Sequence, residues 1–200
     1  MKQFYTTVNE IVQNQWNALK AFTKRYNEII GSTASQERKD ADKKTLENEC
    51  MATGKANYEA FMEAVKLKKS QLPAQLNTWK HASDPALTNI LLVLGTGNKI
   101  SGDQILAMAE TFKDDYISIE AIKAAAQSAG INELSIAPLR SHLGDRPERI
   151  LEAYEQRAYR AFLSNPHTPG VALGQLLEYT AKALAGEDIS YVVQPYADVL

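Results

Sequence analysis

The sequence contains a single cysteine, Cys50, among its 200 residues. One cysteine excludes an internal disulfide, and a reducing compartment is the expected setting for such a chain. No histidine lies near Cys50 in the sequence. We therefore interpret Cys50 as a small apolar side chain on a helix and not as a nucleophile.

Long apolar runs are also absent. The longest aliphatic run extends only from Ile90 to Leu94, whereas a helix that spans a bilayer needs about 20 predominantly apolar residues. The first residues lack the uninterrupted apolar core of a signal peptide. We therefore expect a soluble protein that has no membrane partner and is located in the cytoplasm or assembled in a virion.

Charge of one sign does not dominate the chain. Lysine and arginine number 22 against 24 aspartate and glutamate residues, which gives a formal net charge of −2. This balance argues against an extended electrostatic surface for nucleic acid or an anionic membrane, although it leaves room for a local basic patch.

Proline is missing from the first 72 residues, and glycine occurs there only at Gly31 and Gly54. Both scarcities favour long helices, because these two residues are the least favourable inside a helix. Apolar side chains recur every three or four residues from Tyr5 to Ile29. This period predicts an amphipathic helix of about 25 residues.

A second helix is predicted from Gln36 to Ser70, after a break in which Ser35 is suited to be the N-cap. Leu72 and Pro73 are expected to end it. The two helices predict a hairpin with a coiled-coil-like character. The alternative is one long helix over residues 5–70.

The expected tip of this hairpin shows a mismatch. Residues 36–45 are nearly all charged, and in a hairpin they would lie beside residues 21–30. Leaving a large apolar side chain exposed to water forfeits about 1.5–3 kcal/mol. We therefore expect the tip to contact either the C-terminal domain or another protein, through Phe22, Tyr26, Ile29 and Ile30.

Four helix-start residues recur at intervals of 17 residues: Asp84, Ser101, Ser118 and Ser135. Aspartate and serine are favoured N-caps, so the pattern predicts four short helices. The spacing fits either a short helical repeat or a compact domain whose helices have similar lengths. Two longer helices are predicted to follow, over residues 146–163 and 168–186.

These predictions give an all-α fold with four parts. Residues 1–72 form the hairpin, 73–83 a linker, 84–186 a compact helical domain, and 187–200 an extended tail. The tail is rich in β-branched and aromatic residues, so it is expected to pack on the domain or to add as a strand to a partner. Its candidate contact residues are Tyr191, Val193 and Tyr196.

Residues 122–140 resemble the helix-turn-helix corner of DNA-binding repressors. The resemblance rests on Ala126, Gly130, Ile131, Ile136 and Leu139, and it implies two closely crossing helices and a DNA-reading role. Two departures from the pattern are a proline inside the second helix and the lack of basic side chains at its exposed positions.

The sequence has one local cluster of basic side chains, which could contact phosphate or an acidic partner. Interleaved glutamates nearly neutralise it, as expected for a solvated helix face. The cluster consists of Arg140, Arg146, Arg149, Arg157 and Arg160.

No catalytic, cofactor-binding or metal-binding motif is recognisable. His81, His142 and His167 are far apart and have no metal-ligand spacing. The glycines between Gly95 and Gly102 lack the adjacent Gly-Lys-Ser/Thr of a phosphate-binding loop. We therefore expect no catalytic residue, no metal and no cofactor.

The sequence thus favours a non-enzymatic structural, assembly or protein-interaction protein, of the kind found among phage or mobile-element virion and scaffold components. Its partner would be a second copy or another protein, bound through the N-terminal helices and the tail. The alternative is a nucleic-acid-binding adaptor that uses the corner at 122–140 and the arginines. An enzyme whose site is assembled from scattered residues is a third, weaker hypothesis.

Overall fold

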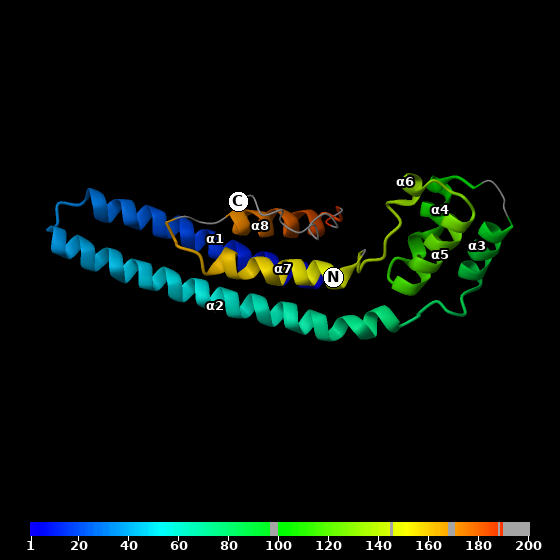
Figure 1. Cartoon of the computed structure of the whole chain (residues 1–200), viewed down its shortest axis with the longest axis horizontal. Helices are drawn as coiled ribbons and strands as arrows, with labels where there is room; N and C mark the ends of the chain where they lie inside the picture. Colours follow the sequence, from blue (N-terminus) through cyan, green and yellow to red (C-terminus); the bar gives the residue numbers. More distant parts are fainter. Residues whose placement is uncertain (97–99, 145, 168–170, 188, 190–200) are drawn as a thin grey trace. The chain divides into compact units, whose positions relative to one another are not determined.

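A computed structural model describes residues 1–96, 100–144, 146–167, 171–187 and 189. All regular elements in these ranges are helical, which confirms the predicted all-α fold. None of the described helices is long and apolar enough to cross a membrane. The elements are α1 (Lys2–Gly31), α2 (Gln36–Asn77), α3 (Pro85–Gly95), α4 (Gly102–Ala109), the 3₁₀ helix η1 (Glu110–Phe112), α5 (Tyr116–Ser128), α6 (Glu133–Ile136), α7 (Pro147–Phe162) and α8 (Val171–Leu184) (Figure 1).

The two long helices, α1 and α2, pack together as the predicted hairpin (Figure 1). Residues 32–35 separate them, so the alternative of one continuous helix is wrong. Polar side chains join the two helices along their length: Asn57 Nδ2 donates to Gln15 Oε1 at 2.9 Å, and Arg25 Nη1 lies 2.9 Å from Glu49 Oε2.

The second helix is longer than predicted, because α2 passes through Pro73 and ends at Asn77. Proline removes one backbone N–H and crowds the preceding turn, but it does not oblige a helix to stop. The residues after it, Ala74, Gln75 and Leu76, have high helix propensity and continue the helix.

Contacts divide the chain into two compact units. The first, here called the short-helix unit, contains Met1 and Ser70–Pro147. The second, the bundle unit, contains Lys2–Lys69 and the chain from Glu148 onward. This grouping differs from the predicted compact domain over 84–186, because α7 and α8 belong with the hairpin and not with the short helices.

Tyr154 of α7 explains why that helix joins the hairpin. Its side chain is 0% exposed, and its ring lies 6.2 Å from the Phe61 ring of α2 in a nearly parallel arrangement. The rings of Phe4 and Tyr5 of α1 lie 6.0 Å and 6.3 Å away. The apolar faces of α1 and α2 thus enclose α7, which neither helix could do alone.

Gly54 allows α2 and α7 to approach closely. A Cβ atom at this position would lie 2.4 Å from the carbonyl oxygen of Phe162. On the other side of the bundle unit, α8 packs along α1, and Thr180 Oγ1 lies 3.3 Å from Asn9 Oδ1.

The short-helix unit has its own apolar core, which α3, η1, α4, α5 and α6 share with the turn that follows α6. Its buried members are Leu87, Ile90, Leu94, Ile105, Ala109, Phe112, Ile119, Ile122, Ala126, Ile136 and Leu139.

Two of the four predicted caps are confirmed. Asp84 Oδ1 accepts from the backbone N–H of Ala86 at 2.8 Å and begins α3. Ser101 begins α4 in a capping box with Gln104, each side chain bonding the other residue's backbone.

The other two predicted caps are wrong by three residues. Helix α5 begins after Asp115 and α6 begins after Asn132, so Ser118 and Ser135 lie inside their helices. Aspartate and asparagine cap helices as well as serine does, and each comes first in the chain here. Because the starts are not evenly spaced, the interval of 17 residues does not mark a structural repeat.

The predicted helix-turn-helix corner is only partly present. Gly130 adopts a φ of +76° after α5, and the N–H of Ile131 donates to the Ala126 carbonyl at 3.1 Å, an arrangement that terminates a helix. The following helix, α6, has four residues and contacts α4. At that contact a Cβ on Gly102 would lie 2.5 Å from Ser135 Cβ. Helix α6 is therefore too short to lie in a DNA groove as a recognition helix.

Candidate functional site

The aromatic side chains near the hairpin tip are covered by the same chain. Phe22 is 3% exposed, and the ring of His167, which follows α7, lies 5.1 Å from it and 4.6 Å from the ring of Tyr26. His167 Nε2 also lies 3.0 Å from Glu47 Oε1. Phe22 is thus covered by a later part of the same chain, which is one of the two alternatives that the sequence left open for the tip.

The charged segment at the start of α2, residues 36–45, also covers part of the aromatic side chains near the tip. Lys43 Nζ lies 5.8 Å from the centre of the Tyr26 ring, and the Lys43 side chain is only 23% exposed. A lysine can shield an aromatic ring with its aliphatic stem and its ammonium group, which the argument from sequence overlooked. Beyond Tyr26, Ile29 is half-buried and Ile30 is 50% exposed.

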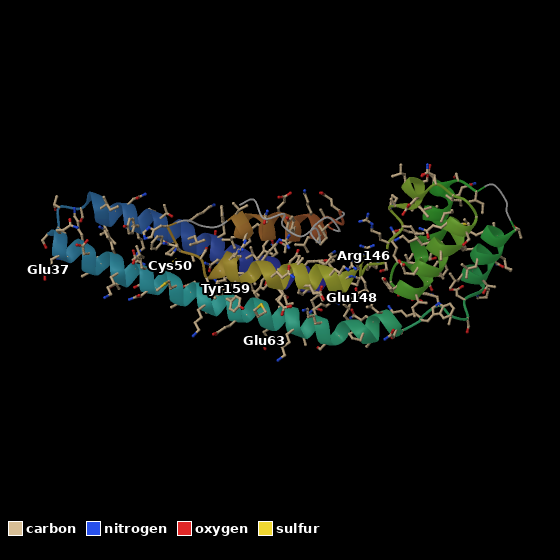
Figure 2. The ribbon with its side chains drawn as sticks, viewed as in Figure 1. Glu37, Cys50, Glu63, Arg146, Glu148 and Tyr159 are labelled. Carbon is tan, nitrogen blue, oxygen red and sulfur yellow. The ribbon has the colours of Figure 1, made fainter. Side chains whose placement is uncertain are left out.

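The other predicted contact residues are distributed as follows. Tyr191, Val193 and Tyr196 lie outside the described residues. Cys50 lies on α2 as predicted, 8% exposed, and burial raises the pKa of its thiol. Figure 2 shows Cys50 on the part of α2 nearer the hairpin tip, where Glu37 lies.

The five predicted arginines belong to two different units. Arg140 and Arg146 fall in the short-helix unit, whereas Arg149, Arg157 and Arg160 fall in the bundle unit. Arg157 is 8% exposed, lies 5.6 Å from the ring of Tyr179 and donates to the Ala153 carbonyl at 3.0 Å. Its position and contacts are those of a core residue. The arrangement therefore gives no support for one continuous basic surface.

One face of α1 lies against a cavity of about 330 Å³. The lining residues recur at three- and four-residue steps, so they share one side of the helix. Leu19 forms a buried floor and Trp16 is half-buried. The lining residues are Trp16, Leu19, Lys20, Thr23, Lys24 and Asn27, and we call them the α1 face.

The α1 face carries positive charge. Lys20 Nζ lies 5.5 Å from the centre of the Trp16 ring. Within the described part of the chain, neither Lys20 nor Lys24 forms an ion pair, whereas Arg25 on the same helix is paired with Glu49. Among the described residues, the α1 face therefore combines an aromatic and aliphatic floor with two cations that form no ion pair.

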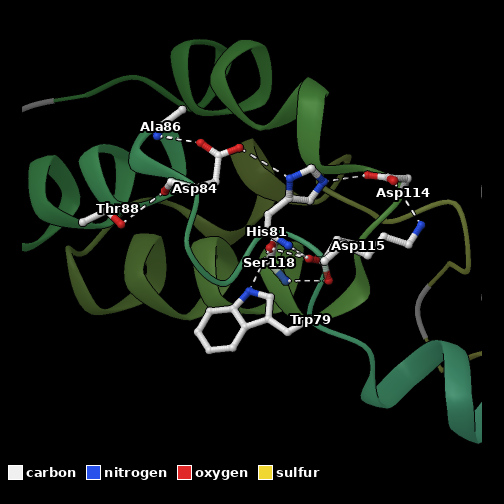
Figure 3. A network of polar contacts seen from close by, with 9 residues as sticks. Trp79, His81, Asp84, Ala86, Thr88, Asp114, Asp115 and Ser118 are labelled. Carbon is white, nitrogen blue, oxygen red and sulfur yellow. Dashed lines mark hydrogen bonds and ion pairs between the residues drawn. The ribbon is translucent and has the colours of Figure 1, made fainter.

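A second polar site lies between residues 79–81 and the loop before α5 (Figure 3). The indole Nε1 of Trp79 donates to Ser118 Oγ at 3.1 Å, and the backbone N–H of His81 donates to Asp115 Oδ2 at 2.9 Å. Asp115 is 1% exposed and also caps α5. Within the short-helix unit, the chain after α2 is thus attached to the start of α5 by both side-chain and backbone bonds.

The His81 ring lies between two carboxylates (Figure 3). Its Nδ1 is 3.4 Å from Asp84 Oδ2, its Nε2 is 3.1 Å from Asp114 Oδ1, and its edge faces the Phe112 ring at 5.1 Å. The hydrogen bond to Asp114 is the largest cause that raises the pKa of His81 above its usual value. Bonds from Lys80 first, and then His81, lower the pKa of Asp114.

This site does not have the geometry of a Ser-His-Asp triad. Ser118 Oγ bonds Asp115 and Trp79 and has no bond to the His81 ring, whose two nitrogens both face carboxylates. Within the described ranges, no group of three or more histidine, cysteine, aspartate or glutamate side chains is placed to hold a metal ion.

Sequence reasoning placed Trp79 and His81 in a connecting segment and gave them no role. The one indication in the sequence was Asp115, which stands three residues before Ser118 and could therefore cap the helix through the Ser118 backbone N–H.

Comparison of the chain with protein-family models, with curated proteins and with solved structures found no match.

Proposed function

We propose that this protein is a protein-interaction module whose α1 face binds an acidic amphipathic segment of a partner protein. The observation that carries the proposal is the cavity on α1, where Trp16 and Leu19 lie beside two lysines that pair with no carboxylate in the described part of the chain. The sequence favours an assembly or interaction role, and the proposal adds the chemical class of the partner.

The chemistry of the α1 face matches a helix or extended segment with both apolar and acidic side chains. Apolar side chains of the partner would cover Trp16 and Leu19, at a gain of about 25 cal/mol per Å² of apolar surface buried. Carboxylates would pair with Lys20 and Lys24. From Trp16 to Asn27 the face is about 16 Å long, or three helical turns, which a partner helix of about 12 residues would span.

A protein partner suits the α1 face better than a nucleic acid. Nucleic acids are bound by grooves in which many basic side chains follow the phosphates, and this chain has a net charge of −2. Two lysines flanking an apolar floor are closer to the arrangement by which helical grooves bind amphipathic helices.

A fluorescence titration tests the proposal. In a Trp79→Phe background, Trp16 is the only tryptophan, so its emission reports the α1 face directly. The probe is a synthetic 15-residue helical peptide with leucines on one face and glutamates on the other. We expect saturable binding that weakens at least about tenfold in the double variant Lys20→Glu/Lys24→Glu, since two charge pairs are lost.

The matched control is Lys44→Glu/Lys66→Glu, which makes the same charge change at two exposed lysines of α2. This variant should bind the peptide as the parent does. Equal loss of binding in both double variants, or no saturable binding in the parent, would overturn the proposal. Tighter binding of a 15-nucleotide single-stranded DNA than of the acidic peptide would favour the nucleic-acid alternative instead.

A further inference from the structure

Three consecutive residues after α2, namely Trp79, Lys80 and His81, all bind the short segment from Asp114 to Ser118. Trp79 bonds Ser118 at 3.1 Å, Lys80 Nζ bonds Asp114 Oδ2 at 3.0 Å, and the His81 backbone bonds Asp115 at 2.9 Å. The His81 ring adds its contacts with Asp84 and Asp114 (Figure 3). We call this set of contacts the clasp.

We infer that protonation of His81 closes the clasp and holds residues 78–83 on the segment from Asp114 to Ser118, and that loss of the proton releases them from that segment. The inference is independent of the proposed binding function, because the α1 face belongs to the bundle unit. It assigns the chain a conformational response to pH.

All contacts of the clasp can form together only when the His81 ring is an imidazolium. Both ring nitrogens face carboxylate oxygens, which are acceptors only. An imidazolium ring donates from both nitrogens, whereas a neutral ring has one N–H and can satisfy only one carboxylate. Deprotonation therefore leaves one of the two carboxylates without an N–H facing it, and it removes the attraction of a cation for both aspartates.

All but one of the charged groups around His81 favour the protonated form of its ring. Asp84 faces the ring from the start of α3, and Asp114 and Asp115 face it from the segment before α5. Lys80 is the opposing cation, and its ammonium is itself paired with Asp114. Phe112 of η1 contributes an uncharged edge contact. With a neutral His81, three carboxylates share this site with a single cation.

The sign of the response follows from the raised pKa of His81. The clasp is closed below the ordinary histidine pKa of about 6.5, where the ring is protonated in both the held and the released state. It opens as the pH rises through the pKa that His81 has when it is held. The response therefore falls on the neutral to mildly basic side of the ordinary histidine range.

Trp79 reports the state of the clasp. In a Trp16→Phe variant, Trp79 is the only tryptophan, and its accessibility to acrylamide can be measured from pH 5 to pH 9. We expect a single upward step in quenching as the pH rises, because Trp79 loses its bond to Ser118 when the segment is released. In His81→Gln the step should be absent.

Two further variants test whether the step in quenching comes from His81. His142→Gln changes another exposed histidine of the same unit and should keep the step. Asp114→Asn retains His81 but removes one of its carboxylates, so the midpoint of the step should move to lower pH.

Circular dichroism of each variant establishes that it is folded before quenching is compared. A step that persists in His81→Gln, or a parent protein with no step, would overturn the inference. So would an NMR titration in which the ring of His81 has a pKa below about 6.5.

Discussion

Asp115 accepts four hydrogen bonds at a position that is 1% exposed. The donors are the backbone N–H groups of His81, Ile117 and Ser118 and the hydroxyl of Ser118. One carboxylate thus caps a helix and also attaches a segment from elsewhere in the chain. The sequence shows the aspartate but not the second role, since His81 comes 34 residues earlier.

Replacing Asp115 should cost more stability than replacing the serine that the sequence pattern favours as the cap. Asp115→Ala leaves several buried N–H groups without an acceptor, and we expect a loss of about 2–4 kcal/mol in the free energy of unfolding. Ser118→Ala removes only the hydroxyl bonds and should cost about 1 kcal/mol. Urea unfolding at pH 7 measures both, and an equal or reversed order would contradict the assigned cap.

The stability contributed by His81 should depend on pH in a predictable direction. Because its pKa is raised, this contribution is present below about 6.5 and is lost as the pH rises through the folded-state pKa. The lowered pKa of Asp114 makes its contribution present above about 3.8 and lost as the pH falls through its folded-state pKa.

The difference in unfolding free energy between the parent and His81→Gln should therefore be largest between about pH 4 and pH 6.5 and should shrink at higher pH. Its size should not exceed about 1 kcal/mol, because the partner carboxylates are substantially exposed and screened by solvent. Urea unfolding across pH 4 to 9 measures this difference. A difference that grows with pH would contradict the assignment.

At the scale of elements, short-range signals placed most helices but not all of their ends. Helices α1, α3, α4 and α7 begin or end within a few residues of the predicted positions. Helix α2 continues through Pro73, and α5 and α6 each begin three residues earlier than predicted. The differences at α5 and α6 arise where two residues compete for the N-cap and only the surrounding contacts select between them.

The closest contact between α2 and α7 gives a prediction about glycine. An alanine at Gly54 would place its Cβ 2.4 Å from the Phe162 carbonyl oxygen, a backbone atom that cannot move alone. We expect Gly54→Ala to lower the unfolding free energy by about 1–3 kcal/mol, although alanine is the better helix former.

The matched control is Gly174→Ala in α8, where nothing lies within 4 Å of the added Cβ. That variant should gain about 0.5–1 kcal/mol through helix propensity alone. Thermal unfolding of the two variants measures the contrast. Stabilisation by both substitutions would show that α2 and α7 do not approach each other as described.

At the scale of the whole molecule, the bundle unit is discontinuous in sequence. Its two segments, Lys2–Lys69 and the chain from Glu148 onward, flank the short-helix unit. The hairpin core includes Phe61, which is 0% exposed and stacks on Tyr154 of α7. The hairpin alone would leave much of that surface exposed to water.

The short-helix unit and the predicted hairpin should therefore behave differently when they are produced separately. A fragment of residues 70–147 should be helical and unfold cooperatively, because it contains a complete apolar core. A fragment of residues 1–72 should unfold with a broad transition unless a fragment that contains α7 and α8 is added. Circular dichroism melts measure both, and a cooperative hairpin fragment would contradict the described bundle.

The candidate sites could be predicted only in part. The period of α1 shows that Trp16, Leu19 and Lys20 lie on one side of the helix. It does not show that Lys20 and Lys24 pair with no carboxylate of the residues that the structure describes. The sequence left open whether Phe22 is covered by a later part of the chain or by another protein, and in the structure it packs against His167, which comes 145 positions later. Contacts over such separations leave no trace in local periodicity.

The sequence by itself determined the class of this fold and the places where most helices begin. These properties follow from spacing, capping residues and the scarcity of proline and glycine, all of which act within a few residues. The tertiary structure decided which helices pack together, which side chains cover the hairpin tip and how His81 meets its carboxylates. Those outcomes depend on apolar faces and charges that are distant in the chain and become neighbours only after folding.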